Sequence, residues 1–330
     1  MKSDLADVIN QMQEKKILVI GDMVADVYLQ GMISRISREA PVLVLEQAEE
    51  KIVAGGAANV VHNIATLGGA VWAVGLLGQD QAGEGLAQIL AEKGVHIDGL
   101  LSVSNRSTIT KTRIIAGGAA TVSQQIVRID KETKMPISPA MEAKIMNSLA
   151  NILKNVDGVV ISDYGSGTLT DSITKQILYN CKKSNIPCMV DSRYNILGFT
   201  GIDYVKQNDA EASANVGFEI VSEDSLLEAG AILLEKMQAK GILITHGDKG
   251  MTLFEASGAV HNIPVSNRSE VFDVSGAGDT CVAAMILALS AGVEPALAAE
   301  ISNIASGIAV RKLGTATVSA AELKNAIGVL

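Results

Sequence analysis

Cysteine is scarce in this chain, and its few cysteines form no metal-binding pattern. The 330 residues contain three, Cys181, Cys188 and Cys281, an odd number with no pair at the spacing of metal ligands. The four histidines are scattered, without a His-Glu-x-x-His motif. The sequence therefore supports neither zinc chemistry nor a Cys-His nucleophile, and we expect reduced thiols in a cytoplasmic protein.

Excess positive charge and long apolar runs are also missing. Lys and Arg number 27 against 36 for Asp and Glu, which gives a net charge of −9. Binding to a nucleic acid or an anionic membrane needs a basic face, so neither partner is expected. No apolar run is long enough to cross a membrane, and residues 1–7 carry acids where a signal peptide would be basic and then apolar. Any phosphate group must therefore be bound by local glycines, helix ends and a few basic side chains.

Short apolar runs alternate with helix-period segments, and no linker, repeat or low-complexity stretch divides them. This alternation is typical of a parallel sheet covered by helices on both faces. Strands are expected at residues 17–20, 71–74, 159–161, 188–190, 203–206 and 242–244. Helices are expected at residues 57–67, 83–92, 139–153, 171–182, 222–237, 279–290 and 295–310. In such sheets ligands bind at the carboxyl ends of the strands.

Two segments, at about 24–54 and 107–130, interrupt the alternation. They contain strand-like runs without a helical period, at residues 27–29, 42–45, 110–115 and 121–129. These runs can form a small separate β-layer over the strand ends, which would act as a lid. The alternative is an antiparallel extension at the edge of the main sheet. We interpret residues 1–330 as a single domain with these lid segments inserted.

A glycine turn near the C-terminus carries the most informative functional signal. The turn reads Gly276-Ala277-Gly278-Asp279 and runs directly into an apolar segment. Glycines let backbone N–H groups approach an anion, and a helix N-terminus adds positive potential, so the turn can hold phosphates. An aspartate there suits a base that accepts the proton of an attacking hydroxyl. The alternatives are a helix-capping acid and a dinucleotide-binding turn, the latter weakened because Cys281 stands where Gly or Ala would complete the motif.

Polar residues also follow the first strand and open the first central helix. Asp22 and Asp26 can accept hydrogen bonds from the hydroxyls of a polyol. Gly55 and Gly56 let a ligand approach the backbone, and Asn59 offers both a donor and an acceptor to a sugar. A turn acid, an acid at the base of the lid and an ordinary helix start are the alternatives.

Candidates for nucleotide binding follow two later strands and lie in the last long helix. They are Asn208, Asp209, Ala210, Glu211, Thr245, Gly247, Gly250 and Asn303. The side-chain oxygens of Asn208 and Glu211 face the same way on a first helical turn, which suits a hydrated Mg²⁺ that bridges phosphates. The same spacing occurs in helix capping boxes, and the other candidates can be plain turn or packing residues. No P-loop motif is present, so nucleotide binding must use another scaffold.

The order of these motifs along the chain resembles the ribokinase (PfkB) family of carbohydrate kinases. The likeness extends over nearly the whole chain, and residues 34–42 and 312–318 resemble the branch that phosphorylates C1 of D-glycero-D-manno-heptose 7-phosphate, a step toward ADP-heptose for lipopolysaccharide. The resemblance implies a ribokinase-like α/β fold with a doubly wound, mostly parallel sheet flanked by helices. It also implies a small β-sheet lid that commonly forms homodimers, and an enzyme that uses ATP and Mg²⁺ to phosphorylate a small sugar or sugar phosphate.

Roles for individual residues follow from the same resemblance. Asp279 would be the catalytic base, and the amides of Gly276, Ala277 and Gly278 would neutralise transition-state charge. Residues 208–211 would serve the nucleotide and Mg²⁺. The residues that would contact the sugar or its phosphate are Asp22, Asp26, Arg35, Gly55, Gly56, Asn59, Lys111, Arg113 and Asp163.

The chain departs from the heptose branch at several basic positions. Ser166 replaces the lysine of Ser-Asp-Tyr-Ala-Lys-Gly, Arg193 replaces that of Asp-Pro-Lys, and Lys206 stands at the first position of Thr-Pro-Asn. Because Arg and Lys differ in geometry, we expect a rearranged phosphate site, and the identity of the sugar stays open.

Two further functions remain as alternatives. One is a non-catalytic sensor that binds a sugar phosphate on the same scaffold, and the other is a nicotinamide-dependent dehydrogenase. Bifunctional heptose enzymes also carry a nucleotidyl-transferring domain with a His-x-Gly-His motif, which this sequence lacks. We therefore expect no adenylyltransferase activity from this chain.

Overall fold

A nine-stranded, mostly parallel sheet forms the centre of the molecule. The computed structural model describes residues 2–117, 123–265 and 271–329. The order of the main sheet is β13-β12-β11-β10-β9-β8-β1-β4-β5, in which β12 pairs antiparallel with both β11 and β13 and all other described pairings are parallel. The strands are β1 (Lys16–Gly21), β4 (Ala70–Gly78), β5 (His96–Val103), β8 (Gly158–Asp163), β9 (Cys188–Ser192), β10 (Tyr204–Asn208), β11 (Gly241–Thr245), β12 (Met251–Glu255) and β13 (Val260–Ile263). The chain progresses outward in both directions from β1, so the carboxyl end of β1 is the topological switch point.

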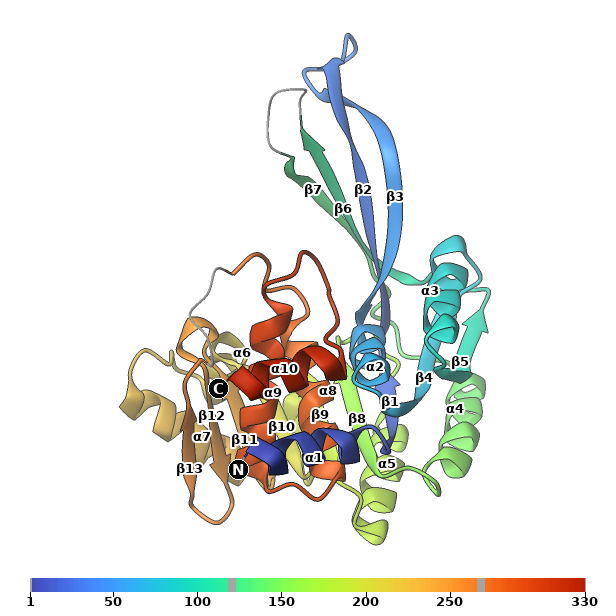
Figure 1. Ribbon diagram of the computed structural model, residues 1–330. Helices are drawn as coiled ribbons and strands as arrows, with labels where there is room; N and C mark the ends of the chain where they lie inside the picture. Colours follow the sequence, from blue (N-terminus) through green and yellow to red (C-terminus); the bar gives the residue numbers. More distant parts are fainter. Residues whose placement is uncertain (1, 118–122, 266–270, 330) are drawn as a thin grey trace.

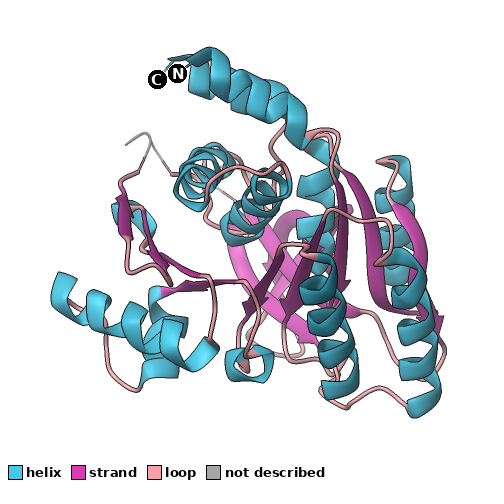
Figure 2. Cartoon of the chain, turned by 90° about the horizontal axis from the view of Figure 1, so that it is seen from below, coloured by secondary structure: helices cyan, strands magenta, loops and turns pink. Residues whose placement is uncertain are grey.

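Helices cover both faces of this sheet (Figures 1 and 2). Ile17 and Val19 of β1 belong to the core on one face, whereas Leu18 and Ile20 belong to the core on the other. The first core is completed by α1 (Lys2–Met12), α2 (Ala57–Thr66), α3 (Gln81–Glu92), α8 (Ala277–Ser290), α9 (Pro295–Ala309) and α10 (Ala320–Val329). The second is completed by α4 (Pro139–Ile152), α5 (Asp171–Ser184), the 3₁₀ turn η1 (Ile196–Phe199), α6 (Asp209–Val216) and α7 (Glu223–Met237). Burial on both faces explains why the strands are continuous apolar runs rather than alternating ones.

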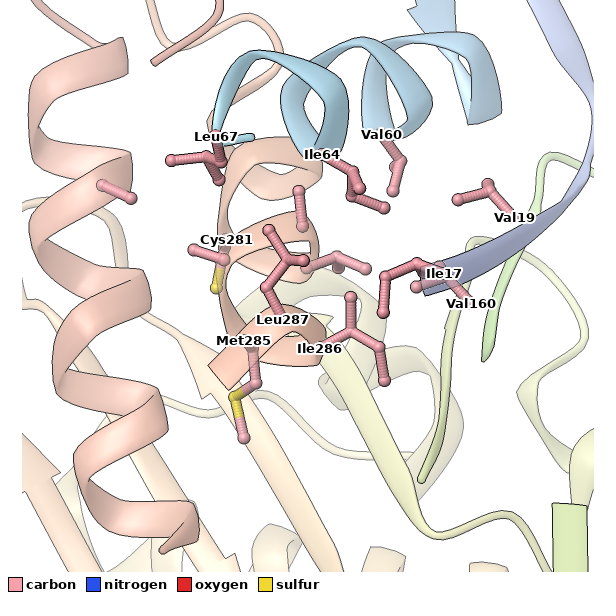
Figure 3. Packing of buried hydrophobic residues seen from close by; sticks show 14 of the residues in the cluster. Ile17, Val19, Val60, Ile64, Leu67, Val160, Cys281, Met285, Ile286 and Leu287 are labelled. Carbon is pink, nitrogen blue, oxygen red and sulfur yellow. The ribbon is translucent and has the colours of Figure 1, made fainter. Parts of the chain in front are cut away.

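Helix α8 is the central helix of the first core. Its residues from Asp279 to Leu289 are all buried, which fits a helix that is apolar around its whole circumference. Figure 3 shows Met285, Ile286 and Leu287 of α8 packed among residues of α2, β1 and β8. Packing thus fixes α8 from Asp279 onward, while residues 276–278 before it are only partly buried.

A second sheet, which we call the outer sheet, projects from the carboxyl end of β1 (Figure 1). Its order is β3 (Leu43–Gly56), β2 (Met23–Ile36), β6 (Ile109–Gly117) and β7 (Gln124–Lys131). Pairing is antiparallel between β2 and β3, parallel between β2 and β6, and antiparallel between β6 and β7. The predicted separate β-layer is confirmed, and the alternative of an extension of the main sheet is wrong.

The predicted helices and strands are present, with shifted ends and some additions. The helix expected from residue 83 begins at Gln81, because the carboxylate of Asp80 accepts a hydrogen bond from the Gly83 amide at 2.9 Å and caps the helix. The helix expected from Asp279 begins at Ala277. Of the strand expected at 121–129, residues 121 and 122 lie outside the described part, and the strand β7 begins at Gln124. Two helices (α1 and α10) and three strands (β5, β12 and β13) were not predicted, and of α6 only the first turn was expected.

Candidate active site

The candidate base lies in the first turn of α8, at the edge where the outer sheet meets the main sheet. Gly276 precedes α8 with φ of 79°, and a Cβ there would lie 2.5 Å from Nδ2 of Asn59, so this turn requires glycine. Asp279 is only 7% exposed, and its Oδ2 accepts a hydrogen bond from Asn59 Nδ2 at 2.8 Å. The Tyr164 hydroxyl lies 3.4 Å from the other carboxylate oxygen. The structure thus brings Asp279 and Asn59, which are 220 positions apart in the sequence, into direct contact.

Burial raises the pKa of Asp279 to about 7. The hydrogen bond from Asn59 and the charge of Lys206 lower this pKa, whereas the carboxylates of Asp191 and Asp26 raise it. A carboxylate with a pKa near neutrality can both accept a proton and release it at physiological pH. Asp279 therefore has the electrostatic environment that a general base needs.

Two buried polar residues that were not predicted hold Asn59 in this orientation. Asn63 Nδ2 donates to the backbone oxygen of Asn59 at 3.0 Å and to its Oδ1 at 3.2 Å, so the Asn59 NH₂ group is directed at Asp279. The Thr280 hydroxyl in turn donates to Oδ1 of Asn63 at 3.0 Å. In the sequence, Asn59 and Asn63 are polar residues four positions apart on an otherwise apolar helix. This pattern by itself does not reveal that both side chains are buried.

Asp22 and Asp26 lie at the start of the outer sheet, close to the switch point. One oxygen of Asp22 accepts hydrogen bonds from the backbone amides of Tyr164 at 2.9 Å and Ser166 at 3.0 Å. The other oxygen is buried and has no hydrogen-bond partner among the described residues. Asp26 accepts a hydrogen bond from Arg113 at 2.8 Å. Asp22 thus shapes the loop after β8 and retains one free acceptor.

The glycines before α2 leave no room for side chains. A Cβ on Gly55 would lie 2.6 Å from Oδ2 of Asp26, and one on Gly56 would lie 2.7 Å from Cγ2 of Val24. Gly56 also has φ of 53°, which glycine tolerates best. The two glycines therefore let the β3-to-α2 connection pass directly over the Asp26 carboxylate.

The remaining sugar candidates are placed differently. Asp163 accepts hydrogen bonds from the Gly165 amide at 3.0 Å and the Ser192 hydroxyl at 2.7 Å, so it connects two loops rather than facing an open site. Burial raises its pKa. Arg35 is exposed near the far end of β2, and the structure does not bring it to the other candidates.

Lys206 is a buried cation beside the glycine turn and was noted in the sequence only as a departure. Its Nζ lies 3.1 Å from Oδ2 of Asp191, and a Cβ on Gly278 would lie 2.8 Å from that same Nζ. Burial acts to lower the pKa of Lys206, but the charges of Asp191 and Glu211 outweigh it and hold the pKa above its ordinary value. The ammonium therefore stays charged between the glycine turn and the segment that begins α6.

The segment 208–211 forms a capping box at the start of α6. The Glu211 amide donates to Oδ1 of Asn208 at 2.8 Å, and the Asn208 amide donates to Oε2 of Glu211 at 2.9 Å. Asp209 lies 2.5 Å from Nδ1 of His246, and Ala210 occupies the same turn. Among the described ranges, no group of three or more His, Cys, Asp or Glu side chains is arranged to hold a metal ion.

The last nucleotide candidates lie around β11 and α9. Thr245 ends β11, and the 3₁₀ turn η2 (Gly247–Lys249) follows, closed by Gly250 with φ of 96°. Asn303 is buried in α9 and donates to the backbone oxygen of Pro264 at 2.7 Å. Asn303 therefore supports the chain after β13.

None of the helices in the described part of the chain has the length and apolar character to span a membrane.

Comparison with known proteins gives consistent matches over almost the whole chain. A sequence profile of the pfkB family of carbohydrate kinases matches residues 14–322. The bifunctional protein HldE of Citrifermentans bemidjiense is 42% identical over 312 residues, which cover 94% of this chain and 63% of that protein. HldE of Geobacter metallireducens is 41% identical, with coverage of 94% and 62%. The chain thus spans less than two thirds of the length of these relatives.

Solved structures with the same fold include two sugar kinases. Ribokinase of Arabidopsis thaliana, complexed with ribose and ATP, has a TM-score of 0.74 at 21% identity, covering 95% of this chain and 99% of that one. Phosphofructokinase-2 of Escherichia coli has a TM-score of 0.74 at 19% identity, covering 96% and 99%. These likenesses confirm the predicted ribokinase-like fold.

Proposed function

Because the chain belongs to the pfkB family of carbohydrate kinases, we propose that it transfers the γ-phosphoryl group of ATP to the C1 hydroxyl of D-glycero-D-manno-heptose 7-phosphate or a closely related sugar phosphate. The dehydrogenase alternative is set aside by the family assignment. The heptose substrate is supported by the resemblance of residues 34–42 and 312–318 to the heptose branch. The observation that carries the proposal is the buried Asp279, with a pKa of about 7, at the glycine turn before α8.

In the proposed reaction, Asp279 accepts the proton of the attacking hydroxyl as the bond to phosphorus forms. Asn59 holds the carboxylate in place by a hydrogen bond of 2.8 Å. The backbone amides of Gly276 and Gly278, at the positive end of α8, stabilise negative charge that develops on the transferred phosphoryl group, whereas the Ala277 amide donates to the backbone oxygen of Val274 at 3.3 Å. The Lys206 ammonium, packed against Gly278, adds a fixed positive charge on the same side.

Asn208 and Glu211 are the residues that fit a hydrated Mg²⁺ at the donor phosphates. The capping box uses one oxygen of Glu211 and leaves the other carboxylate oxygen without a hydrogen bond to the described residues. Mg²⁺ usually keeps several water ligands and needs only one or two carboxylates, so this arrangement suits it. When bound, the ion would neutralise charge on the donor phosphates.

A coupled assay of ADP release over a panel of sugars and sugar phosphates tests the proposed function. We expect turnover with heptose 7-phosphate, and Asp279→Asn should lower kcat about 10²- to 10⁴-fold because the base is lost. Asp98→Asn, at an exposed position of β5, is the matched control and should behave as the wild type. Near-normal turnover by Asp279→Asn would sink the assignment of the base. Thermal stabilisation by a sugar phosphate without any ADP release would instead favour the non-catalytic sensor.

A further inference from the structure

Arg106 lies in the connection between β5 and β6 and donates three hydrogen bonds to backbone oxygens. Its guanidinium donates to Thr133 at 3.1 Å and to Met135 at 3.3 Å, both of which follow β7 of the outer sheet. It also donates to the backbone oxygen of Ser166, in the loop after β8 of the main sheet. One side chain therefore closes the base of the β6–β7 pair and attaches this pair to the main sheet.

The backbone beside Arg106 is fixed to the end of β4. The amide and the hydroxyl of Thr108 donate to the two carboxylate oxygens of Asp80 at 2.9 and 2.6 Å, and the Gly78 amide donates to the Thr108 hydroxyl at 2.9 Å. A Cβ on Gly78 would lie 2.8 Å from the backbone oxygen of Arg106. Because β4 and β8 lie on opposite sides of β1, Arg106 connects the two halves of the main sheet across the switch point.

The loop that Arg106 holds supplies the two amides that bond to Asp22. These are the amides of Tyr164 and Ser166, and the other oxygen of the fully buried Asp22 has no partner among the described residues. Within the same ranges, no Lys or Arg side chain forms an ion pair with Asp22. Burial lowers the pKa of Arg106, whereas the charge of Asp22 acts to raise it. Arg106 therefore stabilises a buried carboxylate by its charge as well as through the loop.

The loop has a second attachment that does not involve a side chain. The Ile137 amide donates to the backbone oxygen of Gly167 at 3.2 Å. Gly167 has φ of 78°, and a Cβ there would lie 2.5 Å from the backbone oxygen of Met135. Backbone contacts thus already hold the far end of the loop, and the Arg106 guanidinium acts on the part around Ser166 that bonds to Asp22.

The same loop lies against residues expected to contact the acceptor. The Tyr164 hydroxyl is 3.4 Å from Asp279, and Nζ of Lys111 lies 4.7 Å from the centroid of the Tyr164 ring. The nucleotide candidates follow β10 and β11, farther along the sheet from β8. A displaced loop would therefore disturb the acceptor side of the site rather than the donor side.

We propose that Arg106 is a positioning residue for the acceptor, which holds the loop after β8 so that the free oxygen of Asp22 faces a hydroxyl of the sugar. This inference rests on the proposed function and concerns a residue that was not predicted from the sequence. A guanidinium suits the role, because its planar set of N–H donors reaches carbonyl oxygens in separate segments. An ammonium would keep the charge but could not reproduce this geometry.

The test measures KM for heptose 7-phosphate and KM for ATP separately. Arg106→Gln should raise KM for the heptose about 10- to 100-fold, because the hydrogen bonds and the charge near Asp22 are lost. Arg106→Lys keeps the charge and should raise it about 3- to 10-fold. KM for ATP should change less than about twofold in both variants. Lys236→Gln is the matched control and should change neither constant, since Lys236 also joins two elements by donating to a backbone oxygen, that of Asn215 at 3.2 Å.

A double-mutant cycle with Asp22→Asn distinguishes positioning from a general loss of structure. Asp22→Asn keeps an oxygen acceptor for the loop amides and replaces the free oxygen by an NH₂ group. If Arg106 acts through Asp22, adding Arg106→Gln to Asp22→Asn should raise KM for the heptose by less than about twofold. Independent, multiplying losses would overturn the proposal. Equal rises in KM for the heptose and for ATP would also overturn it, because a merely structural contact affects both substrates.

Two outcomes need a further measurement. If Arg106→Gln does not fold, Arg106→Lys decides, and an unchanged KM for the heptose in that variant would reject the positioning role. If the wild type turns over no sugar, the proposed function fails, and calorimetric titration with heptose 7-phosphate tests Arg106 separately. Weaker heptose binding by Arg106→Lys with unchanged ATP binding would then support the role. Equal heptose binding by the two proteins, or none by the wild type, would reject it.

Discussion

Asp279 is a carboxylate in surroundings that disfavour its charge. It is buried between α8, α2 and the loop after β8, and the charged or titratable groups around it are Asp26, Lys111, Tyr164, Asp191 and Lys206. Its pKa of about 7 predicts that kcat/KM falls about tenfold per pH unit below pH 7, because only the ionised form accepts a proton. A pH profile of kcat/KM measures this limb. A rate that is flat down to pH 5 would contradict the assignment.

The same burial predicts a gain of stability when the charge is removed. In the folded protein the pKa of Asp279 is raised from 3.8 to about 7, so the native state binds the proton more tightly than the unfolded chain. The free energy of unfolding therefore falls as pH rises through this range. Asp279→Asn should be more stable than the wild type by about 1–4 kcal/mol at pH 8 and by little at pH 4. Denaturant unfolding at the two pH values measures the difference, and equal stability at pH 8 would contradict the raised pKa.

Lys206 is expected to act on both the base and the phosphoryl group. Its charge lowers the pKa of Asp279, and its ion pair with Asp191 offsets a carboxylate that raises that pKa. Lys206→Met should therefore move the acidic limb of the pH profile to higher pH. It should also lower kcat by about 10- to 100-fold, because a positive charge beside the Gly278 amide is lost. Lys240→Met, at an exposed ion pair with Asp203, is the control and should change neither quantity. If the acidic limb of the pH profile does not shift, the charge of Lys206 does not influence the pKa of Asp279.

At the scale of elements, the start of α6 has a structural role and a proposed role in binding Mg²⁺, and comparison with a second helix cap can distinguish them. Asn208 caps the helix and is also the proposed Mg²⁺ residue. Asn208→Ala should lower the free energy of unfolding by about 1 kcal/mol, as expected for a lost cap. Ser222→Ala removes the equivalent cap of α7 and should cost a similar amount. Only Asn208→Ala should raise KM for the nucleotide at limiting Mg²⁺. If both variants have the same KM for the nucleotide at limiting Mg²⁺, Asn208 acts only as a capping residue.

The elements themselves could largely be predicted, because their signals are local. Apolar runs and helical periods located the strands and helices of the main sheet, and the glycine turn located the start of α8. The helices α1 and α10 were missed because what stabilises them is mutual packing of the two chain ends, as in the contact of Lys324 with Asn10 at 2.6 Å. No local period reports a partner 314 positions away.

The site could be predicted only where a motif marks it. Asp279 and Asn59 lie in glycine-rich motifs, and the structure brings them together. Tyr164 also lies in a motif of the heptose branch, and Lys206 and Arg193 depart from two others, but no motif shows that Lys206 pairs with Asp191 or that Arg193 lies near the Tyr164 ring. Pairing depends on where strands from distant parts of the chain end, and the sequence does not contain this information in a local form.

At the scale of the whole molecule, the outer sheet exposes apolar side chains far from the main core. Exposed apolar residues on its strands and turn are Met32, Ile36, Val42, Leu43, Ile126, Val127 and Ile129. A projecting sheet with such a surface is an unfavourable arrangement for an isolated chain, because exposed strands and apolar patches favour association. The homodimer expected through this sheet therefore stays a prediction with a physical reason behind it.

A charge introduced into the outer sheet should dissociate that dimer. We expect the wild type to have twice the chain mass of 34.4 kDa in sedimentation equilibrium at micromolar concentration. Ile129→Asp places a carboxylate at a 54% exposed apolar position of β7 and should shift the protein to the monomer, since burying an unpaired charge in an interface is costly. Leu227→Asp, at a 40% exposed apolar position of α7, is the control and should leave the mass unchanged. A wild type that is monomeric throughout would reject association through the outer sheet.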